Sequence, residues 1–122
     1  MPASLKKIQS NAFYKCFKLT NVKFGNKLTS IGSRAFYKNY EQKKITIPSS
    51  VTKVHENAFE KCDSMASVTF KGKKTKLGKG VFVDCTGLKK VKLPAKMKYI
   101  PEKTFYGCKN LKSVVLPKPV SF

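Results

Sequence analysis

Phenylalanine recurs along this chain at a fixed interval of 23 residues. The five residues in this register are Phe13, Phe36, Phe59, Phe82 and Phe105. A fixed period of about 20 to 50 residues is typical of repeat architectures, in which each unit buries its apolar face on its neighbours and no central core exists. The period therefore predicts that the 122 residues form one domain, built from five copies of a single structural unit.

Other positions follow the same period without an insertion or a deletion. Written as one unit, the repeat is φxxφxxxAFxxCxxLxxVxφ, where φ is an apolar residue and the next residue is Pro, Gly or Lys. Three residues depart from this pattern: Lys74 stands at an aliphatic position, Asn39 at a cysteine position and Gln42 at a leucine position. Because Asn39 and Gln42 place polar groups at inward positions, the pattern predicts that the second unit is distorted or locally loose.

Two segments of each unit have recognisable secondary-structure patterns. The LxxVxφ segment alternates apolar and outward-facing residues, which predicts a short strand. The φxxxAFxxC segment spaces its apolar residues so that they share one side of a short helical turn. The predicted strands lie near residues 21–24, 44–47, 67–70, 90–93 and 113–116. Proline follows three of them directly and ends the ladder there, because it lacks an N–H group.

Stacking these units in register predicts a repeat solenoid. It would be a right-handed coil with a short parallel β-ladder on one face and short helical turns on the other, with all five phenylalanines of the period buried. Strand neighbours in such a stack lie about 4.8 Å apart. Residues 1–122 would form a single array with repeats at 5–27, 28–50, 51–73, 74–96 and 97–119, and the start of a sixth at 120–122.

One stretch of the repeat resembles the BspA-like type of leucine-rich repeat. Lys44–Val54, followed by Asn57–Cys62, is close to the consensus of that pattern, and the resemblance extends over residues 5–119. It implies a leucine-rich-repeat solenoid without catalytic activity, of a kind found in bacterial and protozoan surface proteins. It also implies adhesion to a host or matrix protein, and a location at the cell surface or outside the cell.

The two ends of the chain bear on its location. The N-terminal residues contain no apolar segment of the signal-peptide type, which indicates either an intracellular protein or a piece of a longer chain. The incomplete unit at residues 120–122 and the lack of a polar capping repeat favour a piece. No run of 18 apolar residues is present, so no membrane span is predicted.

No catalytic, cofactor-binding or metal-binding residue is predicted. The cysteines are Cys16, Cys62, Cys85 and Cys108. They fall on one line along the solenoid, whereas a zinc site needs four ligands that converge on one point. They are predicted to be buried, reduced and poorly reactive thiols, although the spacing of neighbouring coils also allows a disulfide. His55, the single histidine, has no partner at a catalytic spacing, so the chain is predicted not to be an enzyme.

The chain carries a large excess of positive charge. Lys and Arg number 26 against 6 Asp and Glu, a formal net charge of +20. This exceeds the roughly 2 to 8 charges that solubility asks of a small domain, so the surface will attract polyanions even if many lysines only form a solvated coat. One candidate set of binding lysines lies on the exposed strand face, at Lys23, Lys44, Lys90 and Lys92. A second forms a stripe along the return turn, at Lys27, Lys53, Lys73, Lys76 and Lys96.

Three functions fit these observations. The first is a protein-binding module that presents the strand face or the lysine stripe to a host or matrix protein, which rests on the resemblance and on the absence of an active-site motif. The alternative is an intracellular binder of a polyanion, such as nucleic acid, a ribonucleoprotein, an acidic filament surface or an anionic glycan, which rests on the charge. The third is a structural spacer from a longer stalk.

Overall fold

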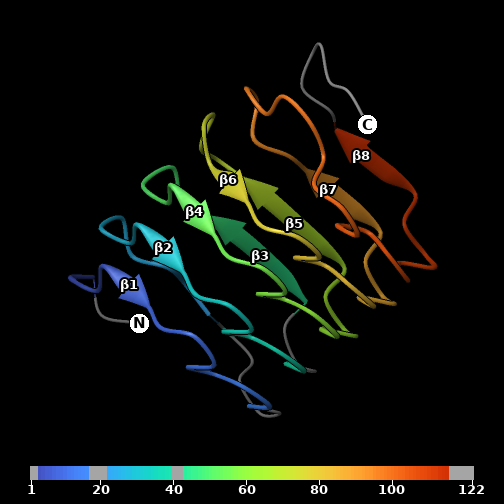
Figure 1. Ribbon diagram of the computed structural model, residues 1–122, viewed down its shortest axis with the longest axis horizontal. Helices are drawn as coiled ribbons and strands as arrows, with labels where there is room; N and C mark the ends of the chain where they lie inside the picture. The colour runs from blue at the N-terminus through green and yellow to red at the C-terminus, as the bar shows by residue number, and fades with distance from the viewer. Residues whose placement is uncertain (1–2, 17–21, 40–42, 116–122) are drawn as a thin grey trace.

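The chain winds into a solenoid of stacked coils. The computed structural model describes residues 3–16, 22–39 and 43–115. Successive coils lie side by side in chain order, from the N-terminal coil at one end to the last described coil at the other (Figure 1). This arrangement confirms the repeat solenoid that the period of 23 predicts.

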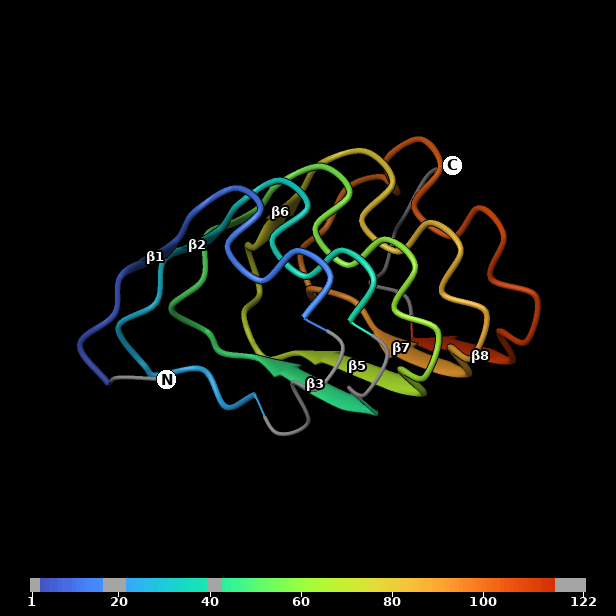
Figure 2. The ribbon, with the colours of Figure 1, turned by 90° about the horizontal axis from the view of Figure 1, so that it is seen from below.

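Two parallel sheets run along the solenoid on different sides of the coils (Figure 2). Sheet A contains, in order, β1 (Lys7–Ile8), β2 (Ser30–Ile31), β4 (Lys53–Val54) and β6 (Lys76–Leu77). Sheet B contains β3 (Lys44–Ile47), β5 (Ser67–Phe70), β7 (Lys90–Lys92) and β8 (Ser113–Val115). Every pair joins a residue to the one 23 positions later, as Val68 to Val91, so the sequence period is also the register of the sheets.

Sheet B is the ladder that the LxxVxφ pattern predicts. β3 and β5 coincide with the predicted strands at 44–47 and 67–70, and β7 ends one residue before the predicted limit of 93. The strand predicted at 21–24 is wrong for residues 22–24, which form no strand. A segment counts as a parallel strand only when it forms the regular hydrogen bonds of a ladder with its neighbour. Residues 22–24 are not part of such a ladder, and among the described strands sheet B begins at β3.

Sheet A was not predicted. Each of its strands contains two residues, one outward and one inward. Alternation of apolar and polar residues indicates a strand only over about four residues or more, so these strands are too short to recognise in the sequence. Backbone hydrogen bonds between coils define these strands. The amide of Gly78, for example, donates to the carbonyl of Val54 at 2.8 Å.

The third side of each coil consists of the segments that lie outside both sheets and are built from turns. We call this side the turn face. Its segments are residues 9–16, 32–39, 55–63, 78–86 and 101–109. The helical turns predicted here are wrong, because no helix occurs in the described part of the chain. Two positions in each segment have positive φ, between 52° and 77°. An α-helix requires negative φ throughout, so these left-handed residues prevent one from forming.

Amides of the turn face alternate between two hydrogen-bond partners. The amide of Phe36 donates to the carbonyl of Ala58 in the next coil at 2.8 Å, whereas the amide of Tyr37 donates to Arg34 within its own coil at 3.2 Å. The same alternation recurs one coil later, where Phe59 donates to Val81 at 3.0 Å. Neighbouring coils are therefore joined by backbone hydrogen bonds on three sides.

The phenylalanines of the period form a stacked column in the centre of the solenoid. Successive ring centroids are 5.2 to 6.0 Å apart, with interplanar angles of 5 to 17°. Phe36, Phe59 and Phe82 are fully buried, as predicted. The prediction is wrong for Phe13 and Phe105, which are only partly buried. Each of these two rings stacks on one ring of the period instead of two, because it belongs to the first or the last copy.

The side chains at the cysteine position of the repeat form a second column beside the rings. They donate hydrogen bonds to the backbone carbonyls of the phenylalanines. The thiols of Cys62 and Cys85 donate to the carbonyls of Phe36 and Phe59 in the preceding coil, with Sγ–O distances of 3.1 and 3.0 Å. Asn39 takes the same place, and its Nδ2 donates to the carbonyl of Phe13 at 2.9 Å. Asn39 is thus buried within the hydrogen-bonded column, contrary to the loose packing predicted for it. Gln42 lies outside the described residues.

Replacing Asn39 with cysteine is expected to stabilise the protein by about 1 to 2 kcal/mol. The thiol would keep the donor to the Phe13 carbonyl, and it would remove the amide Oδ1, which is buried without a partner among the described residues. Urea denaturation should show a higher midpoint for Asn39→Cys and a lower one for the reverse exchange, Cys62→Asn. A lower midpoint for Asn39→Cys would contradict this assignment.

Candidate functional site

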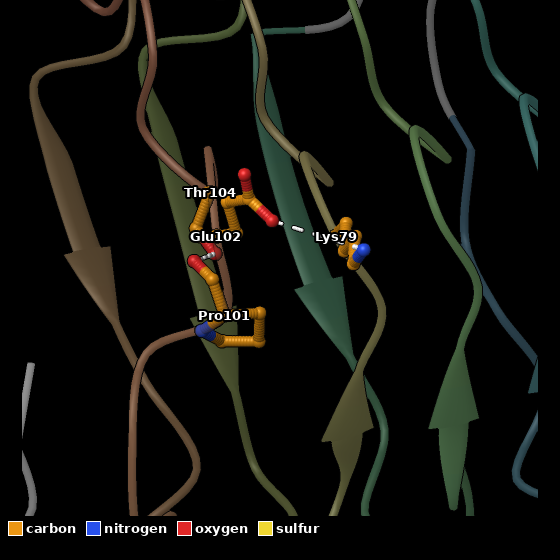
Figure 3. Close-up of polar contacts among 4 residues, drawn as sticks. All are labelled: Lys79, Pro101, Glu102 and Thr104. Atoms are coloured by element: carbon orange, nitrogen blue, oxygen red, sulfur yellow. Dashed lines mark hydrogen bonds and ion pairs between the residues drawn. The ribbon is translucent and has the colours of Figure 1, made fainter.

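Acidic residues are confined to one side of the solenoid. All five acids in the described part of the chain lie on the turn face: Glu56, Glu60, Asp63, Asp84 and Glu102. Figure 3 shows Glu102 reaching Lys79, which occupies the same position of the preceding coil, with an N–O distance of 3.7 Å. These side chains are 66% and 74% exposed, so the pair adds little stability. In the described strands of sheets A and B, the outward positions carry only cationic, neutral polar and apolar residues.

The lysines predicted on the strand face are dispersed over sheet B. Lys44 and Lys90 share one column of outward residues, but Ser67 separates them. Their strands are therefore about 10 Å apart, or two strand spacings. Lys92 lies beside Thr69 in the next column. Lys23 is exposed but belongs to no strand. Within the described residues, this predicted set is therefore spread over sheet B and forms no compact cluster.

The lysines predicted along the return turn are closer together. Lys53 and Lys76 are direct register partners in β4 and β6, with about 4.8 Å between their strands. The amide of Lys96 donates to the carbonyl of Lys73 at 2.8 Å, so these two also belong to neighbouring coils. Lys27 lies apart, because Ser50 occupies the intervening copy of its position. This stripe is dense only in its C-terminal half.

A groove of about 570 Å³ opens beside β4 and β6 in this dense half. Its lining contains Lys53, Lys74, Thr75, Lys76, Leu77, Lys96, Met97, Lys98, Tyr99 and Pro101. The groove brings together three of the predicted site lysines, Lys53, Lys76 and Lys96. It leaves out Lys27, Lys73 and the four lysines of the strand face. We call it the lysine groove.

Seven of the ten lining residues were not among the predicted site residues, and three of these, Lys74, Lys98 and Tyr99, bear on what the lysine groove can bind. Lys74 was visible in the sequence as a lysine at an aliphatic position, and Lys98 belongs to the following unit. Tyr99 occupies the repeat position of Lys53 and Lys76, and this alignment is the signal that would have found it. Its side chain is 63% exposed.

Lys74 departs from the repeat at the position where the lysine groove lies. Leu28 and Val51 occupy the same repeat position in earlier coils, and both are 1% exposed. A lysine keeps its ammonium group in water, so Lys74 is exposed where Leu28 and Val51 are buried. Thr75, next to it, is buried, and its hydroxyl donates to the carbonyl of Val51 at 2.7 Å.

The lysine groove combines a cationic rim with an apolar floor. Five ammonium groups surround it, and none of its lining residues is acidic. Leu77, which is buried, Met97, which is half-buried, and Tyr99, which is exposed, supply its apolar and aromatic lining. The lining contains no cysteine, histidine or carboxylate to serve as nucleophile or base. Its side chains can therefore attract anions, donate hydrogen bonds and cover an apolar group.

The thiols lie away from the lysine groove and are not metal ligands of any cluster in the described residues. Cys62 and Cys85 are buried, as predicted, whereas Cys16 and Cys108 are only partly buried because they lie in the outer copies. All four are free thiols. Burial raises the pKa of Cys62 to about 12 and that of Cys108 to about 11. Such thiols remain protonated and act as hydrogen-bond donors at neutral pH.

Helices that could cross a membrane are absent from residues 3–16, 22–39 and 43–115.

Solved structures with the same fold are bacterial leucine-rich repeat proteins. A protein from Bacteroides ovatus ATCC 8483 is 36% identical, with a TM-score of 0.91 over 100% of this chain and 31% of that one. The T. pallidum leucine-rich repeat protein is 27% identical, with a TM-score of 0.86 over 97% of this chain and 66% of that one.

A leucine-rich repeat protein from Eubacterium ventriosum ATCC 27560 shares the fold at 22% identity, with a TM-score of 0.86 over 98% of this chain and 32% of that one. This chain thus spans about a third of the B. ovatus protein and about two thirds of the T. pallidum protein. No protein with a curated description matches the chain. The family described as "BspA type Leucine rich repeat region (6 copies)" matches residues 1–122. The chain therefore belongs to the BspA-type leucine-rich repeat family.

Proposed function

We propose that this chain is a non-catalytic protein-binding module of the adhesion or interaction type. The observation that carries the proposal is the lysine groove, a concave site with a cationic rim and an apolar floor on a repeat scaffold. Recognition sites in solenoids lie on surfaces that stacked repeats build together. Here β4, β6 and the coil that follows them supply the lining.

The scaffold supports this role because it is ordered before a partner arrives. Backbone hydrogen bonds join neighbouring coils on three sides, and the stacked phenylalanines fill the interior. A preorganised surface loses little conformational entropy on binding, which favours affinity. BspA-type proteins are commonly associated with bacterial surfaces, which supports a host or matrix protein as partner and a location at the cell surface or outside the cell.

A second candidate function, binding of a polyanion, is favoured by the distribution of charge. The outward residues of sheets A and B include many lysines and, in the described part of the chain, no acid. Together with the net charge of +20, this makes two sides of the solenoid attractive to nucleic acid or an anionic glycan. Such binding would weaken steeply with salt, because it releases counterions.

Biolayer interferometry with two charge-matched variants separates these functions. One variant carries Lys53→Glu, Lys76→Glu and Lys96→Glu in the lysine groove. The other carries Lys44→Glu, Lys90→Glu and Lys92→Glu on sheet B, so both lose the same net charge. We expect the wild type to bind immobilised laminin or fibronectin more tightly than serum albumin, an acidic protein outside the matrix. The groove variant should lose at least about tenfold in affinity and the sheet B variant less than about threefold.

Duplex DNA and heparin complete this experiment. Suppose that laminin, fibronectin and albumin all fail to bind this chain, while DNA and heparin bind the groove variant and the sheet B variant with equal affinity. The module would then be a polyanion binder. Equal losses in the two variants for every probe would mean that net charge alone governs association, which would contradict a site at the lysine groove. Circular dichroism should show that both variants keep the fold, because solvated surface changes usually have small effects on stability.

A further inference from the structure

We propose that the lysine groove binds an extended acidic segment of a partner protein, with one aromatic or large apolar side chain of that segment seated against Met97 and Tyr99. This inference rests on the proposed function and specifies its ligand. Three observations support it: the concentration of like charge, the apolar floor, and the spacing of the residues along the solenoid.

The arrangement of charge in the lysine groove favours an anionic ligand. Strands β4 and β6 lie side by side (Figure 1), and Lys53 and Lys76 are direct register partners in them. Like charges placed directly opposite each other destabilise a sheet. Lys74, Lys96 and Lys98 add three further ammonium groups around the same volume. A ligand with carboxylates would be attracted to the lysines and would also reduce the repulsion among them. Both effects favour its binding.

The apolar floor separates a peptide from other polyanions. Met97 is half-buried and Tyr99 is 63% exposed, so the groove leaves apolar and aromatic surface in water when it is empty. A sulfated or phosphorylated chain would pair with the lysines but would leave most of that surface uncovered. A phenylalanine or leucine of a peptide would cover it, and methionine and tyrosine are well suited to such contacts.

The spacing of the groove residues matches that of an extended peptide. Lys53, Lys76 and Tyr99 occupy one repeat position in three consecutive coils. Neighbouring coils are about 4.8 Å apart, so a carboxylate placed between the two lysines lies roughly 7 Å from the level of Tyr99. Alternate residues of an extended chain are separated by about 6.6 Å. An acidic residue followed two positions later by an aromatic residue therefore fits the groove along its length.

The lining of the lysine groove contains a single aromatic side chain, which argues against single-stranded nucleic acid as the ligand. Proteins that bind single strands stack successive bases on several aromatic residues along a basic channel. The described lining of the lysine groove offers Tyr99 alone. The other exposed tyrosines among the described residues, Tyr14 and Tyr106, lie on the turn face, where Lys15 and Lys103 lie over their rings.

Fluorescence anisotropy with short synthetic peptides tests this inference. The probe peptide consists of Glu, Ser and Gly with Glu-Ser-Phe at its centre. A first matched peptide replaces that Phe with Ala, and a second replaces every Glu with Gln. We expect the probe to bind wild type at least about fivefold more tightly than the Ala peptide, and the Gln peptide to show no measurable binding. Lys53→Glu with Lys76→Glu should weaken the probe by more than about tenfold, and Lys44→Glu with Lys90→Glu by less than about twofold.

Tyr99→Ala supplies the decisive comparison. It should weaken the Phe probe severalfold and leave the affinity for the Ala peptide unchanged, because coupling between two groups in contact is seen only when both are present. Equal effects on the two peptides would overturn the seating of an aromatic residue. Tighter binding of single-stranded DNA or a heparin oligosaccharide than of the probe, unaffected by Tyr99→Ala, would overturn the peptide as ligand.

The same measurements distinguish failure of this inference from failure of the proposed function. If the probe does not bind but the groove variant still loses binding to a matrix protein, the proposed function stands and the acidic peptide is wrong. If neither the probe nor any matrix protein binds to the wild type, both are wrong. Thermal unfolding of Tyr99→Ala should match the wild type, since the ring is mostly in solvent.

Discussion

Replacing Phe59 with alanine is expected to lower the free energy of unfolding by about 3 to 5 kcal/mol. Its ring is 1% exposed and lies between Phe36 and Phe82, with centroid distances of 5.2 and 6.0 Å. The substitution removes both stacking contacts and leaves a cavity in the centre of the array. The coils on either side hold the backbone at all three faces, so the site cannot collapse to fill the space.

Urea denaturation of Phe59→Ala and Phe13→Ala measures this effect with an internal control. Phe13 is partly buried and stacks on Phe36 alone among the rings of its column, so its loss should be distinctly smaller. The first coil can also fray without opening the rest of the solenoid, because stability in repeat proteins is approximately a sum of local terms. Equal midpoints for the two variants would show that the column does not stabilise the core in the way proposed.

Alkaline pH is expected to destabilise the fold through its buried thiols. Burial is the main cause that raises the pKa of Cys62 from its ordinary value of 9.0 to about 12, and it raises the pKa of Cys85 well above that value. Each thiol must keep its proton to donate to a phenylalanine carbonyl. Because the pKa is higher in the folded state, this contribution is complete below pH 9 and is lost as pH rises from 9 towards 12.

For Cys62 the expected loss is on the order of 1 kcal/mol per pH unit in that range. Between about pH 9 and pH 11, Cys62 alone should account for roughly 2 to 3 kcal/mol, and Cys85 adds to this. The control is the double variant Cys62→Val with Cys85→Val, which keeps every lysine and the partly buried Cys108 of the wild type but lacks the two fully buried thiols. Free energies of unfolding that fall in parallel for wild type and control would contradict this account.

Sheet B and the phenylalanine column could be predicted because their information is local and repeated. Alternation over the four residues of β3 is enough to indicate a strand, and five copies of Phe at one spacing indicate one column. The turn face was predicted wrongly, because the spacing of Ala58, Phe59 and Cys62 is compatible with a helix. What prevents a helix there is a set of hydrogen bonds to carbonyls in the next coil, such as Phe59 to Val81.

The candidate site was predictable only in part. The sequence indicated that Lys53, Lys76 and Lys96 lie along one edge, and it marked Lys74 as a departure from the repeat. It could not show that Lys74 lines a groove together with residues of neighbouring coils, since that depends on how the coils pack. The interpretation of Asn39 failed for the same reason. Its partner is the Phe13 carbonyl of the previous coil, which no local pattern reveals.

The sequence alone determined the repeat length, the register of the coils, the identity of the interior column and the excess of positive charge. These properties follow from side-chain spacing, and in a solenoid each position of the repeat returns to the same place once per coil. The tertiary structure alone decided sheet A, the left-handed turns and the donor role of Asn39. Each of these depends on hydrogen bonds or contacts between residues about one coil apart, so the local pattern around either residue does not contain them.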